Sequence, residues 1–370
     1  MGNSVLDSPV GDVIYLVRCA LGAAVPDDGR IAAMDLDEVY RTATQHLLTS
    51  ACATALEASG IRDTRFIQAK GKAVRKNVIM DTQRAELFRH MDVAGIWHVA
   101  LKGCVLGELY PTYGMRQMAD NDILFDARRA DDVRNIMLSM GFSCESFDAG
   151  AHDVYYKKPV SNFELHRLLF EKLGNRRVWA YYQDPQRLLV SDGANTYGMH
   201  MRDEDFYVYL VAHEYKHFAA GGTGLRSLVD TYVCLRAKED SLDWNYVSKQ
   251  LDELGLTDFE RDNRLLARAL LTGTALTAEQ EAMLAYMAES GTYGTMAHNI
   301  SNQIATYGRW GYLVCRTLPP IESMSSIYPV LRSAPVLLPA CWVLRLASAL
   351  VTKPKTVAYQ LRAAFVEPKG

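Results

Sequence analysis

The feature that most constrains the fold is a change in hydrophobic spacing near residue 96. Before it, residues 10–21, 36–57 and 66–93 carry apolar side chains three and four positions apart, which predicts helices. Residues 96–101 then form a continuous apolar run, typical of a buried strand, and Gly103 follows soon after it. The chain therefore combines helical regions with a separate segment that contains a sheet.

The segment after Gly103 has the pattern of a small sheet with few helices. Short apolar or alternating runs predict strands at residues 123–125, 142–147, 154–157 and 162–168. Residues 130–140 predict a helix that ends before Gly141. These short strands and their few helices cannot build a doubly wound sheet. We therefore expect an α+β fold with a mixed sheet.

Helical spacing returns after residue 203 and divides the chain into regions. The helices predicted there cover residues 206–218, 225–237, 246–254, 258–271 and 278–288. We expect four parts: a helical N-terminal region at 1–91, the sheet-containing core at 92–200, a helical C-terminal domain at 201–320 and a basic apolar tail at 321–370.

Charge and cysteine content exclude several classes of protein. The net charge of −3 argues against the positive field that bulk nucleic-acid binding requires. The seven cysteines include no C-x-x-C pair, which excludes a cysteine-based zinc site and fits a reducing cytosol. No secretory signal is recognisable, and the most apolar stretch, residues 336–351, contains Pro339 and Arg345. We therefore expect a soluble, cytoplasmic protein.

Acidic residues in the strand-forming segment are the strongest candidates for a reactive site. Alternate residues of a strand share one face, so Asp120 and Asp122 are expected to project together. Close carboxylates repel unless a cation lies between them, and such hard oxygen ligands favour Mg²⁺. Glu164 and His166 are expected on the polar face of a later strand, which makes Glu164 a candidate third carboxylate. A solvated strand entrance without a metal is the alternative for an isolated pair.

Basic residues and a glycine turn accompany these carboxylates. Gly103 separates a predicted strand from a predicted helix, and backbone N–H groups at a helix start form an anion site. We expect Lys102 and Arg116 to be countercharges for a phosphate chain. The alternative for both is a structural ion pair with the same acids.

The pattern L-K-G-x(12)-R-x(3)-D-x-D-I-L-F, followed by F-E-L-H, resembles the polymerase-β-like nucleotidyltransferase superfamily. It is most similar to a largely uncharacterised bacterial nucleotidyltransferase family, and the likeness continues at residues 213–230 and 328–345. Two departures are Lys-Gly-Cys in place of Gly-Ser and a wider spacing between Gly103 and Asp120. Asn121 stands where that family usually has an apolar residue, which is expected to loosen the strand.

The resemblance implies a minimal nucleotidyltransferase core and a two-metal reaction. Asp120 and Asp122 would hold two Mg²⁺ ions, and Glu164 would complete the site and accept a proton. A hydroxyl of an unidentified acceptor would then attack the α-phosphate of an NTP, and pyrophosphate would leave. A non-catalytic nucleotide-binding protein of the same fold remains an alternative.

A second motif, His213-Glu214-Tyr215-Lys216-His217, has the H-E-x-x-H form of zinc peptidases. On a helix its two histidines would share one face, with Glu214 as base and Asp230 or Glu239 as third ligand. The interpretation that we prefer is a lid over the nucleotide. In it, cationic or hydrogen-bonding groups (Lys216, His217 and Arg226) contact phosphates, Asp230 fixes Arg226, and the glycine turn at 221–224 approaches the ligand. A packed helix face with no ligand is a further alternative.

The last seventy residues differ from the rest in charge. Residues 301–370 hold eight Lys or Arg against two Asp or Glu, a net charge of +6. Residues 340–351 predict an almost entirely apolar helix, which must be buried in the protein or lie on another surface. We expect burial against the helical C-terminal domain, with peripheral contact to an anionic membrane or binding of an acidic acceptor as the alternatives.

Overall fold

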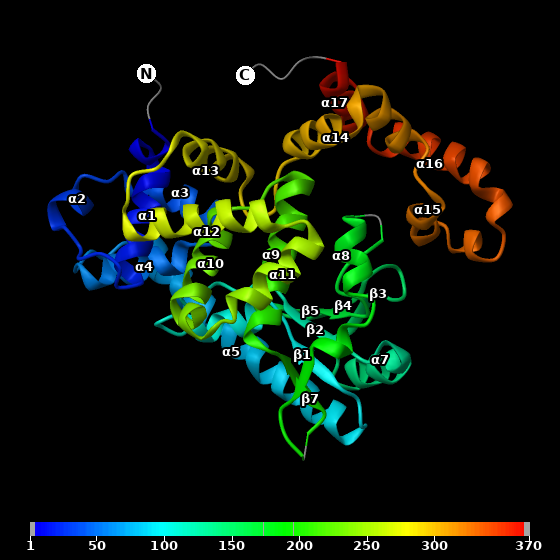
Figure 1. Ribbon diagram of the computed structural model, residues 1–370, viewed down its shortest axis with the longest axis horizontal. Coiled ribbons are helices and arrows are strands. Elements are labelled where there is room, and N and C mark those ends of the chain that lie inside the picture. Colours follow the sequence, from blue (N-terminus) through cyan, green and yellow to red (C-terminus); the bar gives the residue numbers. More distant parts are fainter. Residues whose placement is uncertain (1–3, 173, 195, 366–370) are drawn as a thin grey trace.

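The helices before the sheet are more numerous than the sequence pattern predicts. The computed structural model describes residues 4–172, 174–194 and 196–365, drawn in Figure 1. Its N-terminal helices are α1 (Pro9–Ala20), α2 (Asp28–Ala32), α3 (Leu36–Gln45), α4 (Thr49–Ala58) and α5 (Thr64–Val93). The single helix expected at 36–57 is wrong, because Leu47 has a left-handed backbone (φ 54°) that separates α3 from α4.

The described residues form a seven-stranded mixed sheet in the order β3-β4-β5-β2-β1-β7-β6. Its strands are β1 (His98–Ala100), β2 (Asn121–Phe125), β3 (Ser143–Ser146), β4 (His152–Lys157), β5 (Ser161–His166), β6 (Leu189–Ser191) and β7 (Gly198–Met201). Strands β1 and β7 run parallel, as do β2 and β5, and the other neighbours are antiparallel. The expected α+β class and mixed sheet are confirmed. Strands β6 and β7 are additions, because runs of three and four residues carry too little alternation to be recognised.

The two faces of the sheet pack against different helices. Ile123 and Phe163 face α5 and α7 (Ala130–Ser139), where Leu87 and Met137 complete a core. The opposite face packs its apolar part, which includes Leu124, against α8 (Arg176–Tyr181) and α9 (Asp203–Gly221). Because side chains alternate along a strand, Asp122 of β2 and Glu164 and His166 of β5 point to the α9 side. The site is therefore expected between the sheet and α9.

The helices after the sheet share a core with those before it. They are α9, α10 (Leu225–Lys238), α11 (Trp244–Leu254), α12 (Thr257–Thr272) and α13 (Ala278–Ser290), close to the predicted ranges. Leu16 of α1 and Leu56 of α4 belong to the same buried cluster as Leu228 of α10 and Leu270 of α12. Figure 1 shows these blue and yellow helices side by side. The two helical regions therefore stabilise each other. One helix from each, α5 and α9, packs against an opposite face of the sheet.

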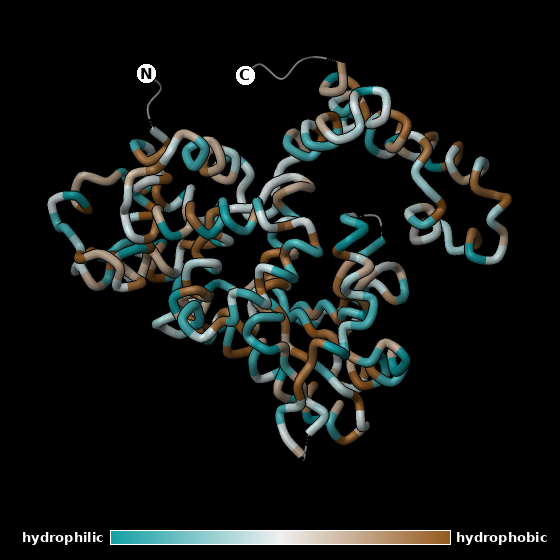
Figure 2. Tube along the Cα trace, in the orientation of Figure 1, coloured by the Kyte–Doolittle hydropathy of each residue, from teal (hydrophilic) through white to brown (hydrophobic). Residues whose placement is uncertain are grey.

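The tail contacts the sheet region through Arg332, which pairs with Asp148 after β3, but its apolar helix is exposed. Its elements are α14 (Met296–Thr317), α15 (Ile321–Ile327), α16 (Leu338–Thr352) and α17 (Pro354–Phe365). The expectation that residues 340–351 are buried is wrong: within α16 only Cys341 is buried, and the hydrophobic positions of this helix are visible in Figure 2. The stretch Pro335–Thr352 is long and apolar enough to cross a membrane, and 6% of it is buried. The stretch extends the apolar run at residues 336–351 by one residue at each end and includes Pro339 and Arg345.

Candidate active site

A cavity of about 430 Å³ lies between the polar face of the sheet and helices α9 and α10. Every residue proposed from the sequence for the nucleotide or its metal lines it: Lys102, Gly103, Arg116, Asp120, Asp122, Glu164, Lys216, His217 and Arg226. These residues come from the loop after β1, from β2 and β5, and from two helices more than fifty residues further along the chain. The fold thus brings both predicted motifs to one place.

The carboxylates meet because β2 and β5 are parallel neighbours. Asp122 and Glu164 are directly opposite each other in the register of this pair, so their side chains share a face. Asp120 precedes β2 by one residue and adds its charge to the same group. The convergence predicted from the i, i+2 spacing is therefore present in the structure.

Asp122 already has two positively polarised neighbours. The Lys102 ammonium donates to its Oδ1 at 2.6 Å, and His166 Nε2 lies 2.9 Å from the same oxygen. Burial opposes ionisation of Asp122, but Lys102 and His166 together hold its pKa well below the ordinary range. Lys102 therefore forms the ion pair with the acids that sequence analysis left as its alternative. Its ammonium occupies the position that a cation would take beside Asp122.

Among the described residues no hydrogen bond reaches the side chain of Asp120 or Glu164, and the histidine nitrogens beside Glu164 are 3.7 and 3.8 Å away. Burial, and then the charge of Asp122, raise the pKa of Asp120 to about 6. Burial, followed by Asp122 and Asp120, raises the pKa of Glu164 to about 7. Raised pKa values in a cluster of acids mean that negative charge is under-compensated there, so a divalent cation would be stabilised. The donor set of three carboxylates fits Mg²⁺.

The glycine turn after β1 has a packing role. The short helix α6 (Gly103–Leu106) begins there, but the N–H groups of Cys104 and Val105 already donate to Leu101 and Lys102. A Cβ on Gly103 would collide with the guanidinium of Arg116. The expected anion site at this helix start therefore has fewer free N–H groups than predicted. Glycine is needed at position 103 because the Arg116 guanidinium lies so close.

Asp230 pairs with Arg116 and not with Arg226, the partner that we expected. Asp230 accepts two hydrogen bonds from Arg116, both 2.8 Å, and a third from Tyr110 at 2.7 Å. The predicted Arg226–Asp230 pair is replaced by a 3.0 Å hydrogen bond from Arg226 to the Gln117 carbonyl. Arg116 is thus a buried structural group that links the segment before β2 to α10. The charge of Arg226 instead lies at the cavity wall.

Lys216 and His217 lie at the exposed rim of the cavity, on the last turns of α9. His213 lies one turn earlier, with its Nε2 3.1 Å from Nε2 of His217. The glycine turn that follows α9 packs closely, because a Cβ on Gly222 would collide with Ser290. The turn therefore fixes the direction of α10, a role that the sequence pattern did not indicate.

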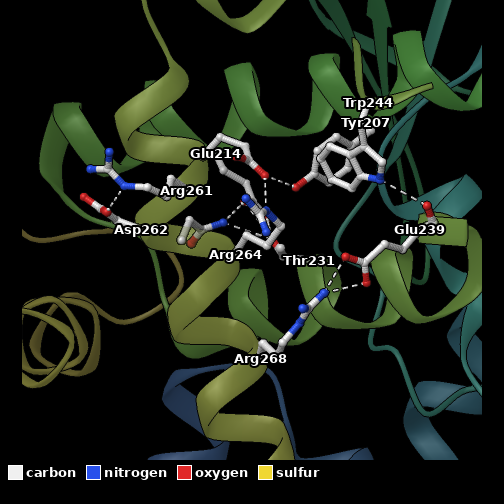
Figure 3. A network of polar contacts seen from close by, with 11 residues as sticks. Tyr207, Glu214, Thr231, Glu239, Trp244, Arg261, Asp262, Arg264 and Arg268 are labelled. Carbon is white, nitrogen blue, oxygen red and sulfur yellow. Dashed lines mark hydrogen bonds and ion pairs between the residues drawn. The ribbon is translucent and has the colours of Figure 1, made fainter. Parts of the chain in front are cut away.

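The zinc-peptidase alternative lacks its remaining groups. Thr231 and Asn263 donate to the Glu214 carboxylate inside the helical core, a network in which Figure 3 labels Glu214 and Thr231. Burial, and then Asp230, raise the pKa of Glu214 to about 8, which is unsuited to a base at neutral pH.

Neither proposed third ligand is available to a zinc ion. Asp230 is bound to Arg116, and Glu239 pairs with Arg268, as Figure 3 also shows. The H-E-x-x-H match is thus a helix face whose two histidines reach the cavity while its glutamate supports the core.

His152 was not among the predicted site residues, and His166, expected on the polar face, had no role assigned to it. His166 and His152 line the cavity, and they are opposite each other in the β4–β5 register. The alternation of β5 placed His166 on the polar face, but nothing in the sequence aligned β4 with it. Asn121 also differs from expectation: it is fully buried and donates to the Met80 carbonyl of α5, so it anchors the strand instead of loosening it.

A mixed sheet that gathers carboxylates opposite basic helix residues is the arrangement that a nucleotidyltransferase requires. The family described as uncharacterised nucleotidyltransferase matches residues 32–272, more than half of the chain. The chain belongs to this family, which implies nucleotidyl transfer from an NTP. The likeness expected at residues 328–345 lies outside the matched range. No curated protein and no solved structure matches the chain.

Proposed function

We propose that the chain transfers a nucleotidyl group from an NTP to a hydroxyl of an acceptor, with Mg²⁺ held by Asp120, Asp122 and Glu164. The observation that carries the proposal is the direct pairing of Asp122 with Glu164 on one face of the sheet, beside a third acid and above a cavity. Bound Mg²⁺ ions would supply charge neutralisation at the entering and leaving oxygens of the phosphoryl centre.

The fit of these residues to a cation is supported by the charges around them. Glu164 and Asp120 have raised pKa values, and the third acid is compensated only by a lysine and a histidine. Lys102 would have to move away from Asp122 as a cation takes its place, and its ammonium could then reach the phosphates. Its positive-φ backbone (φ 46°) places it at the turn after β1, directly beside this site.

The opposite wall of the cavity supplies groups for the phosphate chain. Arg226, Lys216 and His217 come from α9 and α10 and face the carboxylates across the cavity. In the reaction, the acceptor oxygen forms a bond to the α-phosphorus while the bond to the β-phosphate oxygen breaks, and pyrophosphate leaves. We assign to Glu164 the proton of the acceptor hydroxyl, since its carboxylate lines the cavity directly opposite Asp122.

The test uses two positions of the radiolabel. Protein, Mg²⁺ and a set of hydroxyl-bearing acceptors are incubated with NTPs labelled at the α- or at the γ-phosphate. The proposal predicts that the α-label moves to an acceptor and that the γ-label appears in pyrophosphate. Asp122→Asn should lower transfer by at least about a hundredfold, because the charge that it removes is needed in the transition state.

Asp131→Asn is the matched control, since Asp131 is an exposed residue of α7 remote from the cavity. It should transfer label at the wild-type rate. If the γ-label moves to the acceptor, the protein is a kinase. If Asp122→Asn transfers as well as wild type, the assignment of the metal site is wrong. Tight NTP binding without any transfer would favour the non-catalytic alternative.

A further inference from the structure

The polar face of the sheet carries a second set of ligand atoms beside the proposed Mg²⁺ site. Among the described residues, His152, Glu164 and His166 bring one ligand atom each within 4.8 Å of one another. The strand register produces this group, because His152 and His166 are cross-strand partners and Glu164 is two residues before His166 on the same face.

The distances in this group suit a shared ion better than hydrogen bonds. Glu164 Oε2 lies 3.7 Å from His152 Nε2 and 3.8 Å from His166 Nε2, beyond hydrogen-bonding range. Ligand atoms about 2.0–2.1 Å from a tetrahedral ion are separated by about 3.4 Å, so Glu164 is close to that separation from both histidines, while all three ligand atoms lie within 4.8 Å of one another. An ion bound at His166 Nε2 would replace the hydrogen that this nitrogen shares with Asp122, so Asp122 Oδ1, 2.9 Å away, is at hand as a fourth ligand.

The surroundings supply both rigidity and access. The His166 side chain is 7% exposed and the His152 side chain 35%, so one histidine is fixed in the sheet and the other borders the cavity. The Nδ1 atom of His166 is buried without a hydrogen-bond partner, so the ring is incompletely satisfied in the metal-free protein. An ion entering from the cavity would meet His152 and Glu164 first.

We propose that His152, Glu164 and His166 bind a first-row transition-metal ion of the zinc class. Two imidazoles and one carboxylate favour such an ion over Mg²⁺, which prefers oxygen ligands. The site shares Glu164 with the proposed function, but binding at it requires no nucleotide. Its metal differs in kind from the one at Asp120 and Asp122.

The experiment measures Zn²⁺ binding to the full chain by competition with a chromophoric chelator, with Co²⁺ absorption as a second readout. The proposal predicts one tight equivalent that millimolar Mg²⁺ does not displace. His152→Gln and His166→Ala should each weaken binding at least tenfold and remove the Co²⁺ spectrum. His152→Gln keeps the test decisive if the buried His166 variant fails to fold.

His200→Ala and His217→Ala are the controls. His200 is an exposed residue of β7, whereas His217 borders the same cavity from α9. Both variants should bind Zn²⁺ like wild type. Loss of binding in His217→Ala but not in His152→Gln would overturn the proposal in favour of the α9 histidines. Absence of a tight equivalent, or its displacement by Mg²⁺, would also overturn it.

Asp120→Asn separates this proposal from the proposed function. It should abolish nucleotidyl transfer and leave Zn²⁺ binding unchanged, because Asp120 is not among the three ligands. Nucleotidyl transfer by the wild-type protein without Zn²⁺ binding would contradict only the metal proposal. Normal Zn²⁺ binding without transfer would sink the function alone.

An independent observation concerns the exposed tail helix α16. Large apolar side chains cover it and the turn before it, with exposed fractions from 41% to 84%: Val336, Leu337, Val343, Leu344, Leu350 and Val351. Such a continuous apolar surface marks a contact with a membrane or a partner. Lys353 and Lys355 follow directly and are also exposed, in a region with a net charge of +6.

We infer that α16 lies on an anionic lipid surface. The positive charge of the tail favours a lipid surface as the binding partner. An apolar helix flanked by lysines is complementary to a membrane whose headgroups are negatively charged and whose acyl chains lie beneath them. The rest of the chain has a net charge of about −9, so the attraction is confined to this end.

Co-sedimentation of the full chain with vesicles of phosphatidylglycerol and phosphatidylcholine tests this inference. The protein should bind the mixed vesicles, bind pure phosphatidylcholine at least tenfold less, and dissociate in high salt. Leu350→Glu should abolish binding without unfolding, since Leu350 is 61% exposed, whereas Val93→Glu, at an 86% exposed position of α5, should bind normally. Binding that resists alkaline extraction, or self-association lost in Leu350→Glu without vesicle binding, would overturn it.

Discussion

At the scale of single residues, the site is organised by unequal compensation of three carboxylates. Asp122 is held ionised by Lys102 and His166, while burial and mutual repulsion raise the pKa of Asp120 and Glu164. One acid is therefore a permanent anion, and the others become fully charged only when a cation arrives. This makes cation binding and the charge of the site mutually dependent.

Glu164 gives this argument a measurable pH dependence. Its pKa is about 7 in the folded protein, against an ordinary value of 4.5. Between these pH values the folded state binds the extra proton, so stability falls as the pH rises, and the full cost is present above pH 7. Glu164→Gln removes this cost. The variant should therefore gain about 3 kcal/mol over wild type above pH 7 and nothing below pH 4.5.

Urea unfolding of the metal-free protein across this pH range measures the difference in the free energy of unfolding. The comparison between variants cancels the opposite pH dependence of the buried histidines, which both proteins share. Glu86→Gln, at an exposed position of α5, is the control and should follow wild type at every pH. A difference between Glu164→Gln and wild type that stays constant with pH would contradict the account.

At the scale of elements, local patterns determined much of the fold and register determined the site. The carboxylates could be grouped from sequence because alternation along β2 and β5 is a local property. The partners of Arg116 and Asp230 could not, since they depend on how α10 packs against the loop after β1. The same applies to His152, whose place opposite His166 follows from the pairing of two strands across a turn.

The junction between α9 and α10 shows how a glycine can be needed for packing. Gly222 has a left-handed backbone (φ 96°), and a Cβ there would collide with Ser290 at the end of α13. Gly222→Ala should therefore lower the free energy of unfolding by about 2–4 kcal/mol. Gly71→Ala, in the open interior of α5 with no atom near its Cβ position, should instead raise it by about 0.5–1 kcal/mol. Chemical denaturation compares the two, and equal effects would contradict this role.

At the scale of the whole molecule, the sheet is held by helices from both ends of the chain. The family match begins within the N-terminal helices and ends with α12, so it includes both groups of this shared core. The cavity depends on that packing, because its two walls belong to the sheet and to α9 and α10. The domain boundaries expected at residues 91, 200 and 320 stay predictions. The hydrophobic core shared by α1, α4, α10 and α12 is continuous.

This shared core predicts that distant helices unfold together. Leu16 of α1 is fully buried in it, so Leu16→Ala should cost about 2–5 kcal/mol. Hydrogen exchange should then accelerate in α10 and α12 as well as in α1. Val93→Ala, at an exposed position, should change neither stability nor exchange. Faster exchange confined to α1 and α4 would show that the N-terminal region is an independent unit.

The most direct test of the central claim is a crystal structure with Mg²⁺ and a non-hydrolysable NTP. The account predicts Mg²⁺ bound to Asp120, Asp122 and Glu164 and to triphosphate oxygens, with Lys102 displaced from Asp122 and the α-phosphorus open to the cavity. A nucleotide bound outside this cavity, or one bound in it without metal at these carboxylates, would contradict it.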